Sequence, residues 1–253
     1  MPQYGRCLYL KNGAMEMFID TLDGFMRGHG ITLTEKQLQQ FSDYRDLLLE
    51  WNDKINLTAS TDDEGIAEKH FVDCVSAYSP RNFKPGVTVL DIGSGAGFPG
   101  IPIKIMEPGI KLTLMDSLQK RLDFLEALTE KLGFDDVELV HMRAEDAGQD
   151  PKYRETFDIV TARAVARFAI LMEYTLPFTR IGGTVVALKG RQYHEEAMEG
   201  EEALAVLGGE LREERVIEID GGIHAVIEVE KVQHTPDKYP RKAGTPAKKP
   251  IGI

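Results

Sequence analysis

The chain has 253 residues and a formal net charge of -11, from 41 acidic side chains against 30 lysines and arginines. With 42% hydrophobic and 28% charged residues it has the composition of a folded globular protein, which excludes a wholly disordered chain, and its acidity argues against wholesale coating of nucleic acid. No window approaches 18 consecutive apolar residues and the first apolar run is too short for a signal peptide, so we expect a cytoplasmic protein without a membrane partner.

The first part of the chain predicts helices. Residues 14 to about 80 show helical periodicity and no strand-like runs. Thr34 is the expected N-cap of one helix, and a further helix is expected to begin after Asp62 and to end near Pro80. We therefore predict that residues 1–80 form a helical section packed on the core.

From residue 87 onward, short apolar runs alternate with helical segments. The expected strands cover 87–92, 112–115, 137–141, 157–161, 184–188, 216–219 and 225–229, and the expected helices lie around Ile101, over 118–132, near Ala147 and over 166–178. Such alternation predicts an α/β fold with a seven-stranded, mostly parallel, Rossmann-like sheet over residues 81–232. The short turn at 220–222 predicts that the last two strands pair antiparallel at one edge.

The end of the chain reverses the sign of the charge. From residue 231 onward six basic side chains stand against the single acidic Asp237. Four prolines after Gln233 predict that the tail, residues 233–253, is extended rather than helical. A basic surface on an acidic protein can contact phosphates at one defined place, although charge alone favours a solvated tail.

The segment VTVLDIGSGAGFPGIPIKI joins the first predicted strand to a helix through a glycine-rich loop. Glycines let such a loop turn sharply and approach a nucleotide-like cofactor. Gly95, Gly97 and Gly100 fit the dinucleotide pattern GxGxxG, whereas Asp91 followed by Gly93, Gly95 and Gly97 fits the acidic loop of methyltransferases. Electrostatics favours the second pattern, because a carboxylate would repel a pyrophosphate and attract the sulfonium and ammonium of S-adenosylmethionine.

Two further acidic positions follow predicted strands. Asp116 ends the second strand, where a carboxylate can accept both ribose hydroxyls of an adenosine cofactor of either kind. After the third strand, the backbone at Ala144 and the side chain of Glu145 are placed to read the edge of an adenine ring. The alternative role for Glu145 is to cap the short helix near Ala147.

With these segments in hand, the sequence resembles the ribosomal RNA small-subunit methyltransferase G family, also called glucose-inhibited division protein B. The likeness covers nearly the whole chain from about Gly30. It is carried by WNDKINLTA, HFVDC, LDIGSGAGFPGIP, LMDSLQKRLDFL, RAED, TARAVA and the tail YPRKAGTPAKKPI. Cys74 stands where the family usually has serine, and the segment before Met15 resembles an extension whose role stays open.

The resemblance implies a class I methyltransferase fold, S-adenosylmethionine as cofactor, and methylation of N7 of a guanosine in the decoding-region loop of 16S rRNA. It implies a partner that is 16S rRNA or the small ribosomal subunit, and we expect a monomer. It also implies cofactor contacts at Gly93, Phe98, Ala144, Glu145 and Arg163. Together with the loop and strand-end residues, the predicted cofactor site comprises Asp91, Gly93, Gly95, Gly97, Phe98, Asp116, Ala144, Glu145 and Arg163.

Basic residues after the predicted strands and in the tail are candidates for rRNA phosphates, although each alone is typical of a solvated charge. They are Arg143, Arg167, Lys189, Arg191, Arg241, Lys242, Lys248 and Lys249. Guanine N7 carries no proton, so methyl transfer to it needs no general base, and no catalytic acid or base is predicted.

His70 and Asp73 share one helix face, but no further histidine or cysteine is suitably spaced, so we expect a polar contact between the helical section and the core and no metal site. Two alternatives stay open. One is a nicotinamide-dependent oxidoreductase that uses GxGxxG, although no Tyr-x-x-x-Lys constellation is visible. The other is a non-catalytic ribosome-binding module with a vestigial loop.

Overall fold

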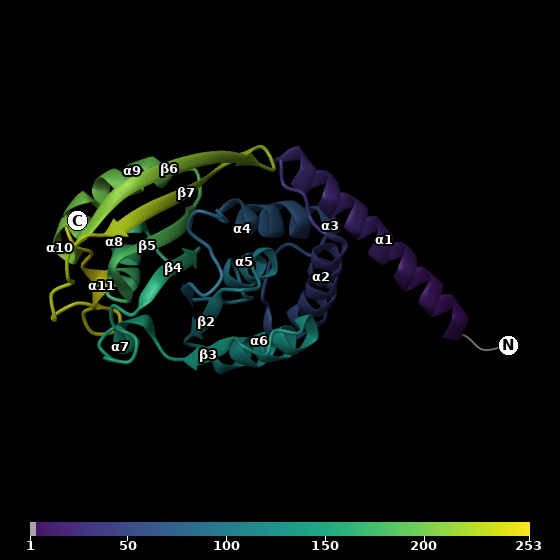
Figure 1. Ribbon diagram of the computed structural model, residues 1–253, viewed down its shortest axis with the longest axis horizontal. Coiled ribbons are helices and arrows are strands. Elements are labelled where there is room, and N and C mark those ends of the chain that lie inside the picture. The colour runs from purple at the N-terminus through teal and green to yellow at the C-terminus, as the bar shows by residue number, and fades with distance from the viewer. Residues whose placement is uncertain (1–3) are drawn as a thin grey trace.

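The computed structural model describes the backbone of residues 4–253 and the side chains of residue 13 and residues 15–253, so residues 1–3 of the predicted helical section lie outside the described residues. A single seven-stranded sheet runs through it (Figure 1). Its strands are β1 (Thr88–Ile92), β2 (Lys111–Asp116), β3 (Glu138–His141), β4 (Phe157–Arg163), β5 (Thr179–Lys189), β6 (Gly209–Ile219) and β7 (Gly222–Lys231). All seven predicted strands are confirmed.

The strand order is β3-β2-β1-β4-β5-β7-β6. Strands β1 to β5 are parallel, and β7 runs antiparallel to both β5 and β6, which confirms the predicted hairpin at one edge. Strand β6 begins earlier than predicted. Its first half, GELREER, is charged and mostly exposed or half-buried, so it lacks the apolar run from which the strand was predicted. Charged side chains on an edge strand discourage pairing with other chains. They also break the apolar pattern by which a strand is predicted from sequence.

The predicted N-terminal helices are present as α1 (Tyr4–Gly28), α2 (Glu35–Ile55), α3 (Asp63–Gly65), a π-helix η1 (Ile66–Val72) and α4 (Asp73–Ser76). Thr34 caps α2 as predicted, in a capping box with Gln37. Asp62 caps α3 by accepting a hydrogen bond from the Gly65 N–H at 2.7 Å. Helices α5 (Gly100–Met106) and α6 (Gln119–Leu132) pack on one face of the sheet, and α2 and α4 pack on them. The second half of α1 packs on α2 and η1, while its first half projects away from the sheet (Figure 1).

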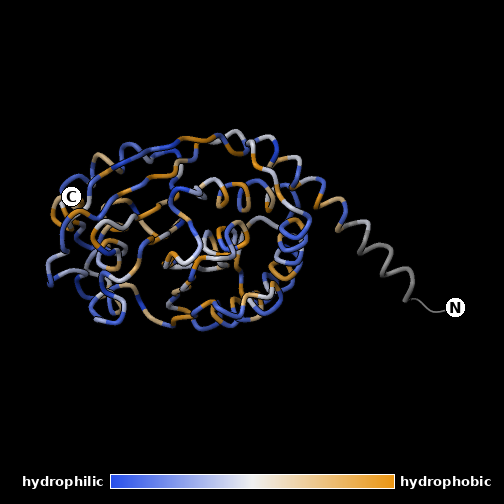
Figure 2. Tube along the Cα trace, viewed as in Figure 1, coloured by the Kyte–Doolittle hydropathy of each residue, from blue (hydrophilic) through white to orange (hydrophobic). Residues whose placement is uncertain are grey.

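The other face is covered by α8 (Phe168–Thr175) and α10 (Glu201–Leu207), with α7 (Ala144–Ala147) and α9 (Tyr193–Glu199) beside them. Alternate strand residues serve the two layers: Val89 packs in the first and Leu90 in the second. Figure 2 accordingly shows hydrophobic positions along the inner strands and hydrophilic ones on much of the outer surface.

The C-terminal tail departs from its prediction. Residues 245–248 form a short helix, α11 (Thr245–Lys248), which follows Gly244 in the left-handed region and has Pro246 in its first turn. Proline is tolerated there, because the first N–H groups of a helix have no helical partner. The expectation of a wholly extended tail is therefore wrong.

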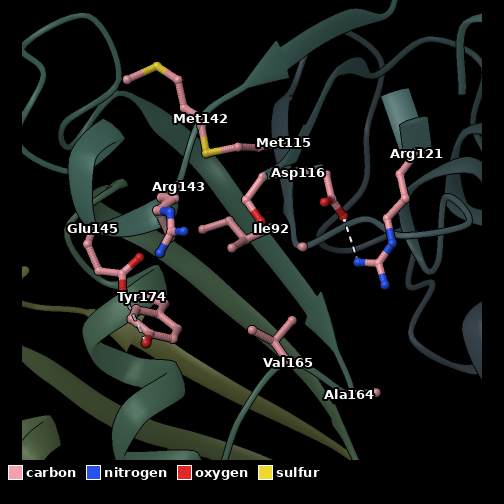
Figure 3. Close-up of a pocket in the computed structure, with 13 residues that line it drawn as sticks. Ile92, Met115, Asp116, Arg121, Met142, Arg143, Glu145, Ala164, Val165 and Tyr174 are labelled. Atoms are coloured by element: carbon pink, nitrogen blue, oxygen red, sulfur yellow. Dashed lines mark hydrogen bonds and ion pairs between the residues drawn. The ribbon is translucent and has the colours of Figure 1, made fainter. Parts of the chain in front are cut away.

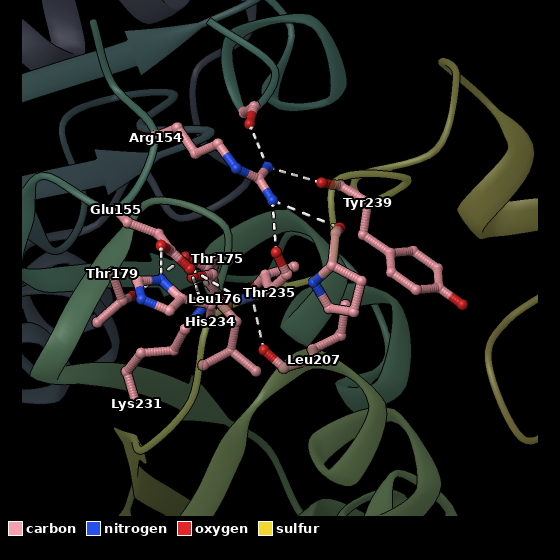
Figure 4. A network of polar contacts seen from close by, with 12 residues as sticks. Arg154, Glu155, Thr175, Leu176, Thr179, Leu207, Lys231, His234, Thr235 and Tyr239 are labelled. Atoms are coloured by element: carbon pink, nitrogen blue, oxygen red, sulfur yellow. Dashed lines mark hydrogen bonds and ion pairs between the residues drawn. The ribbon is translucent and has the colours of Figure 1, made fainter. Parts of the chain in front are cut away.

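Arg154 ties this tail to the core. Its guanidinium donates to the carbonyl oxygens of Gly148, Thr235 and Tyr239 at 2.7–2.9 Å (Figure 4). Beside it, the buried Lys231 ammonium donates to the Leu176 carbonyl at 2.7 Å, and burial lowers the pKa of Lys231 to about 8. The start of the tail is thus anchored rather than free in solvent.

Candidate functional site

The glycine loop between β1 and α5 is shaped by close contacts. Gly93 and Gly97 have φ of +66° and +90°, in the region that disfavours other residues. A Cβ on Gly93 would lie 2.9 Å from Val165 Cγ2, and one on Gly97 would lie 2.9 Å from the Tyr44 hydroxyl oxygen. Glycine is needed at both positions for conformation and for space.

A cavity of about 300 Å³ opens beside this loop, at the carboxyl ends of β1 to β4 (Figure 3). The strand order reverses between β1 and β4, and ligands of open α/β sheets bind at such a reversal. The cavity contains four of the predicted cofactor residues. Its walls are formed by Ile92, Gly93, Met115, Asp116, Ser117, Arg121, Met142, Arg143, Ala144, Glu145, Ala164, Val165 and Tyr174.

Asp116 is held rigidly on the cavity wall. It is 2% exposed and accepts hydrogen bonds from the N–H groups of Gly95 and Leu118, each at 2.9 Å. The Arg121 guanidinium lies 3.3 Å from Oδ2 (Figure 3). Since a carboxylate has about four acceptor positions, these three contacts leave capacity for a further donor, as the predicted ribose contact requires.

Glu145 is bound across the cavity wall. Its Oε1 accepts from the Tyr174 hydroxyl at 3.3 Å and from the Gly244 N–H at 3.1 Å. Burial and the neighbouring Glu145 carboxylate raise the pKa of Tyr174 to about 12, so this phenol stays protonated and donates. Helix α7 has no side-chain cap, so the alternative role of Glu145 as a capping residue is wrong.

Asp91 lies behind the loop and not on the cavity wall. Its buried carboxylate accepts from the Gly100 N–H at 3.1 Å and from the Thr161 hydroxyl at 3.2 Å, and burial raises the pKa of Asp91 to about 7. Asp91 therefore holds the loop to the first turn of α5, whose N–H groups lack helical partners, and its expected contact with a cofactor cation stays a prediction.

Phe98 also supports the loop from behind. The ring is 6% exposed and packs between Tyr44 and His70, with centroid distances of 5.4 and 4.9 Å. The guanidinium carbon of Arg163 lies 4.5 Å from its centroid. Phe98, Gly95 and Gly97 shape the loop and are not among the residues that line this cavity, and their predicted cofactor contacts stay predictions.

Arg163 joins the sheet to the helical section. Its guanidinium donates to Asp73 Oδ2 at 3.0 Å, to the Lys69 carbonyl at 3.1 Å and to His70 Nδ1 at 3.2 Å. Arginine can only donate hydrogen bonds, so Nδ1 of His70 carries no proton and accepts. The proton of the neutral ring is on Nε2, which lies 2.6 Å from the Thr58 hydroxyl oxygen. Burial and Arg163 lower the pKa of His70 to about 4. The predicted polar contact is confirmed.

A second, larger cavity of about 690 Å³ lies at the carboxyl ends of β4 and β5 and shares Ala164 with the first. It contains Arg163, Lys189 and Arg191 of the predicted residues. Sequence reasoning missed the others as site residues, since no local pattern marks them. Its walls are formed by Lys69, His70, Asp73, Arg163, Ala164, Leu188, Lys189, Gly190, Arg191, Gln192, Glu196 and His224.

The candidate RNA-binding residues fall into two groups. Arg167 pairs with Glu199, Lys189 with Glu196 and Arg241 with the fully buried Glu173, so carboxylates already engage these three. The others are exposed and have no ion pair within the described part of the chain. They are Arg143, Arg191, Lys242, Lys248 and Lys249.

Within residues 4–253, no helix is long and apolar enough to cross a membrane. Over the described side chains, no three His, Cys, Asp or Glu residues lie together in a way that would hold a metal ion.

Residues 37–219 match the sequence model of the GidB family, described as rRNA small subunit methyltransferase G. The ribosomal RNA small subunit methyltransferase G of Exiguobacterium sibiricum is 51% identical over 225 residues, which cover 88% of this chain and 94% of that protein. The protein of the same name from Alkaliphilus metalliredigens is 44% identical over 96% of this chain and 98% of that protein. The solved structure of YcgJ from Bacillus subtilis is similar in fold, with a TM-score of 0.50 at 12% identity over 65% of this chain and 100% of that chain.

Proposed function

The chain belongs to the rRNA small subunit methyltransferase G family, and from this premise we infer that it is an S-adenosylmethionine-dependent methyltransferase acting on 16S rRNA, with N7 of a guanosine in the decoding-region loop as its target. The predicted class I methyltransferase fold is confirmed by the sheet order and by the family. Membership excludes the nicotinamide-dependent alternative. The observation that supports methyl transfer best is the pair of adjoining cavities, the smaller one for the adenosine of the cofactor and the larger one for the methyl acceptor. The predicted cofactor contact Arg163 lies on the wall of the larger cavity, next to the shared Ala164.

The smaller cavity fits the adenosine part of S-adenosylmethionine. Asp116 has acceptor capacity for ribose hydroxyls, and the first turn of α7, at Ala144, offers backbone N–H groups to the adenine edge. Met115, Met142 and Val165 supply apolar wall against which a flat ring packs. When bound, the cofactor supplies an electrophilic methyl group on a positively charged sulfur.

The residues of this chain contribute position more than acid–base chemistry. Guanine N7 has an in-plane lone pair and no proton, so the N7–C bond forms as the C–S bond breaks, with the electron pair left on sulfur. No proton moves in this step. Holding the two reactants in line is worth roughly 7 to 11 kcal/mol in the best intramolecular cases. Positive charge passes to the base, so carboxylates near it favour the transfer.

The exposed basic residues are the proposed contacts to rRNA phosphates. Arg143 borders the smaller cavity and Arg191 the larger one, while Lys242, Lys248 and Lys249 lie in the anchored tail. Their charge draws the RNA backbone to the face that carries both cavities, and the remaining acidic surface repels it elsewhere.

Incubation with radiolabelled S-adenosylmethionine and either small subunits or naked 16S rRNA tests the activity, and mass spectrometry of the nucleosides locates the methyl group. We expect label in 7-methylguanosine, and a loss of that nucleoside from cells that lack the gene. Absence of label from both substrates would leave a ribosome-binding module, whereas methylation of another atom would refute only the assignment to N7.

A further inference from the structure

Family membership assigns no role to the larger cavity, although its place beside the smaller one points to the methyl acceptor. The two cavities meet at Ala164, at the end of β4. An acceptor must lie on the far side of the methyl group from the cofactor's adenosine, and the larger cavity lies there if the smaller one holds adenosine. Its volume of about 690 Å³ is within the range of small-molecule sites and accommodates a single nucleotide turned out of an RNA loop.

Guanine has a distinctive hydrogen-bonding edge. It carries donors at N1 and at the N2 amino group, where adenine has an acceptor and a carbon-bound hydrogen, so a carboxylate on the wall separates the two bases. The larger cavity has two carboxylates, Asp73 and Glu196. Each oxygen of Asp73 already has a cationic or ring N–H partner: Oδ2 accepts from Arg163 at 3.0 Å, and Oδ1 lies 2.9 Å from His224 Nδ1.

Glu196 differs from Asp73 in this respect. Its contacts within the described residues are made by Oε2, which lies 2.6 Å from the Lys189 ammonium and accepts from the Phe168 N–H at 3.0 Å. Oε1 is left available, and the side chain is 15% exposed. Two fixed contacts on one oxygen hold the carboxylate in one orientation, which is the preorganisation that selective recognition needs.

We propose that the larger cavity receives the target guanine and that Oε1 of Glu196 accepts a hydrogen bond from its N2 amino group. This inference rests on the proposed function. Glu196 belongs to α9, beyond β5, whereas Ala164 borders the smaller cavity at the end of β4. Guanine carries N7 and N2 on opposite edges, so a base held at Glu196 turns N7 toward the cofactor. The carboxylate also stabilises the cationic methylated base.

The test compares rRNA carrying guanosine at the target with rRNA carrying inosine, which lacks only the N2 amino group. For the natural enzyme, kcat/KM should fall by about 10-fold to 150-fold on inosine, the range for one hydrogen bond to a charged acceptor. In Glu196→Gln, Lys189 and the Phe168 N–H retain the amide oxygen, so an NH₂ donor replaces Oε1. This variant should lose a similar factor on guanosine and show no further loss, within about twofold, on inosine.

Glu195→Gln is the matched control, because it makes the same charge change on an exposed neighbour outside the cavity, and it should discriminate as the natural enzyme does. Cofactor affinity, measured by calorimetry, reports whether each variant is correctly folded. If Glu196→Gln fails to bind cofactor, Glu196→Asp takes its place, because aspartate keeps the charge but has a shorter side chain. An inosine penalty that persists in the Glu196 variants, or is missing from the natural enzyme, overturns the inference. Failure of the natural enzyme to methylate guanosine would instead overturn the proposed function.

Discussion

Replacement of Gly93 with alanine should weaken cofactor binding, whereas Gly133→Ala, at a matched backbone conformation, should not. The φ angles are +66° at Gly93 and +73° at Gly133. A Cβ in this region costs ~1–2 kcal/mol, so both variants should lose about that much unfolding free energy. Among the described residues, a Cβ on Gly133 would meet no heavy atom within 4 Å apart from its chain neighbours, whereas one on Gly93 would lie 2.9 Å from Val165 Cγ2.

Val165 lines the smaller cavity, so relief of this contact moves its side chain into the space that the cofactor needs. Cofactor binding must push Val165 back, and overpacking of this kind costs ~1–3 kcal/mol. The Kd for S-adenosylmethionine should therefore rise by about 5-fold to 150-fold in Gly93→Ala and stay unchanged in Gly133→Ala. Urea unfolding and isothermal titration calorimetry measure the two effects. Equal Kd values in the two variants would refute the argument.

Two further predictions concern protons and salt. The pKa of His70 is about 4 in the folded protein and 6.5 in the unfolded chain. Between these pH values the unfolded chain binds a proton that the folded protein does not. The free energy of unfolding therefore decreases as the pH falls from 6.5 to 4, by at most about 3 kcal/mol. Urea unfolding of His70→Gln at pH 7 and pH 5 should show a smaller decline than the natural protein; an equal decline would assign it to other groups. Combined replacement of Lys242, Lys248 and Lys249 by glutamine should make the salt dependence of rRNA binding weaker. The plot of log association constant against log salt concentration should become less steep by about 2, at about 0.7 per phosphate contact. Lys36→Gln, on α2, should leave the slope unchanged, and an unchanged slope in the triple variant would remove the tail from the RNA contact.

The features that sequence predicted correctly are encoded locally. Seven strands follow from apolar runs between turns, and the N-cap at Thr34 follows from a polar residue before a helical pattern. The glycine loop was recognisable because positive φ and close approach admit almost no other residue. In each case a few neighbouring residues determine the outcome.

The features that sequence missed depend on partners far apart in the chain. The direction of the Asp91 side chain is decided by Gly100 and Thr161, and the position of Arg241 by Glu173. The tail was predicted as extended from its prolines, yet hydrogen bonds from Arg154 bring it against the core, where a short helix forms. No periodicity in the sequence reports such contacts.

The larger cavity illustrates the same limit and indicates what the N-terminal helices contribute. Its walls come from η1, α4, β4, β5, α9 and β7, so Asp73, Arg163 and His224 meet only in the folded chain. From α2, Tyr44 also donates a hydrogen bond to the Ala96 carbonyl within the glycine loop. The helices therefore support the cofactor loop from behind and close one side of the proposed base site. A sheet of this order can bind an adenosine cofactor at its strand ends, but the cavity proposed to select guanine needs the helical section as well.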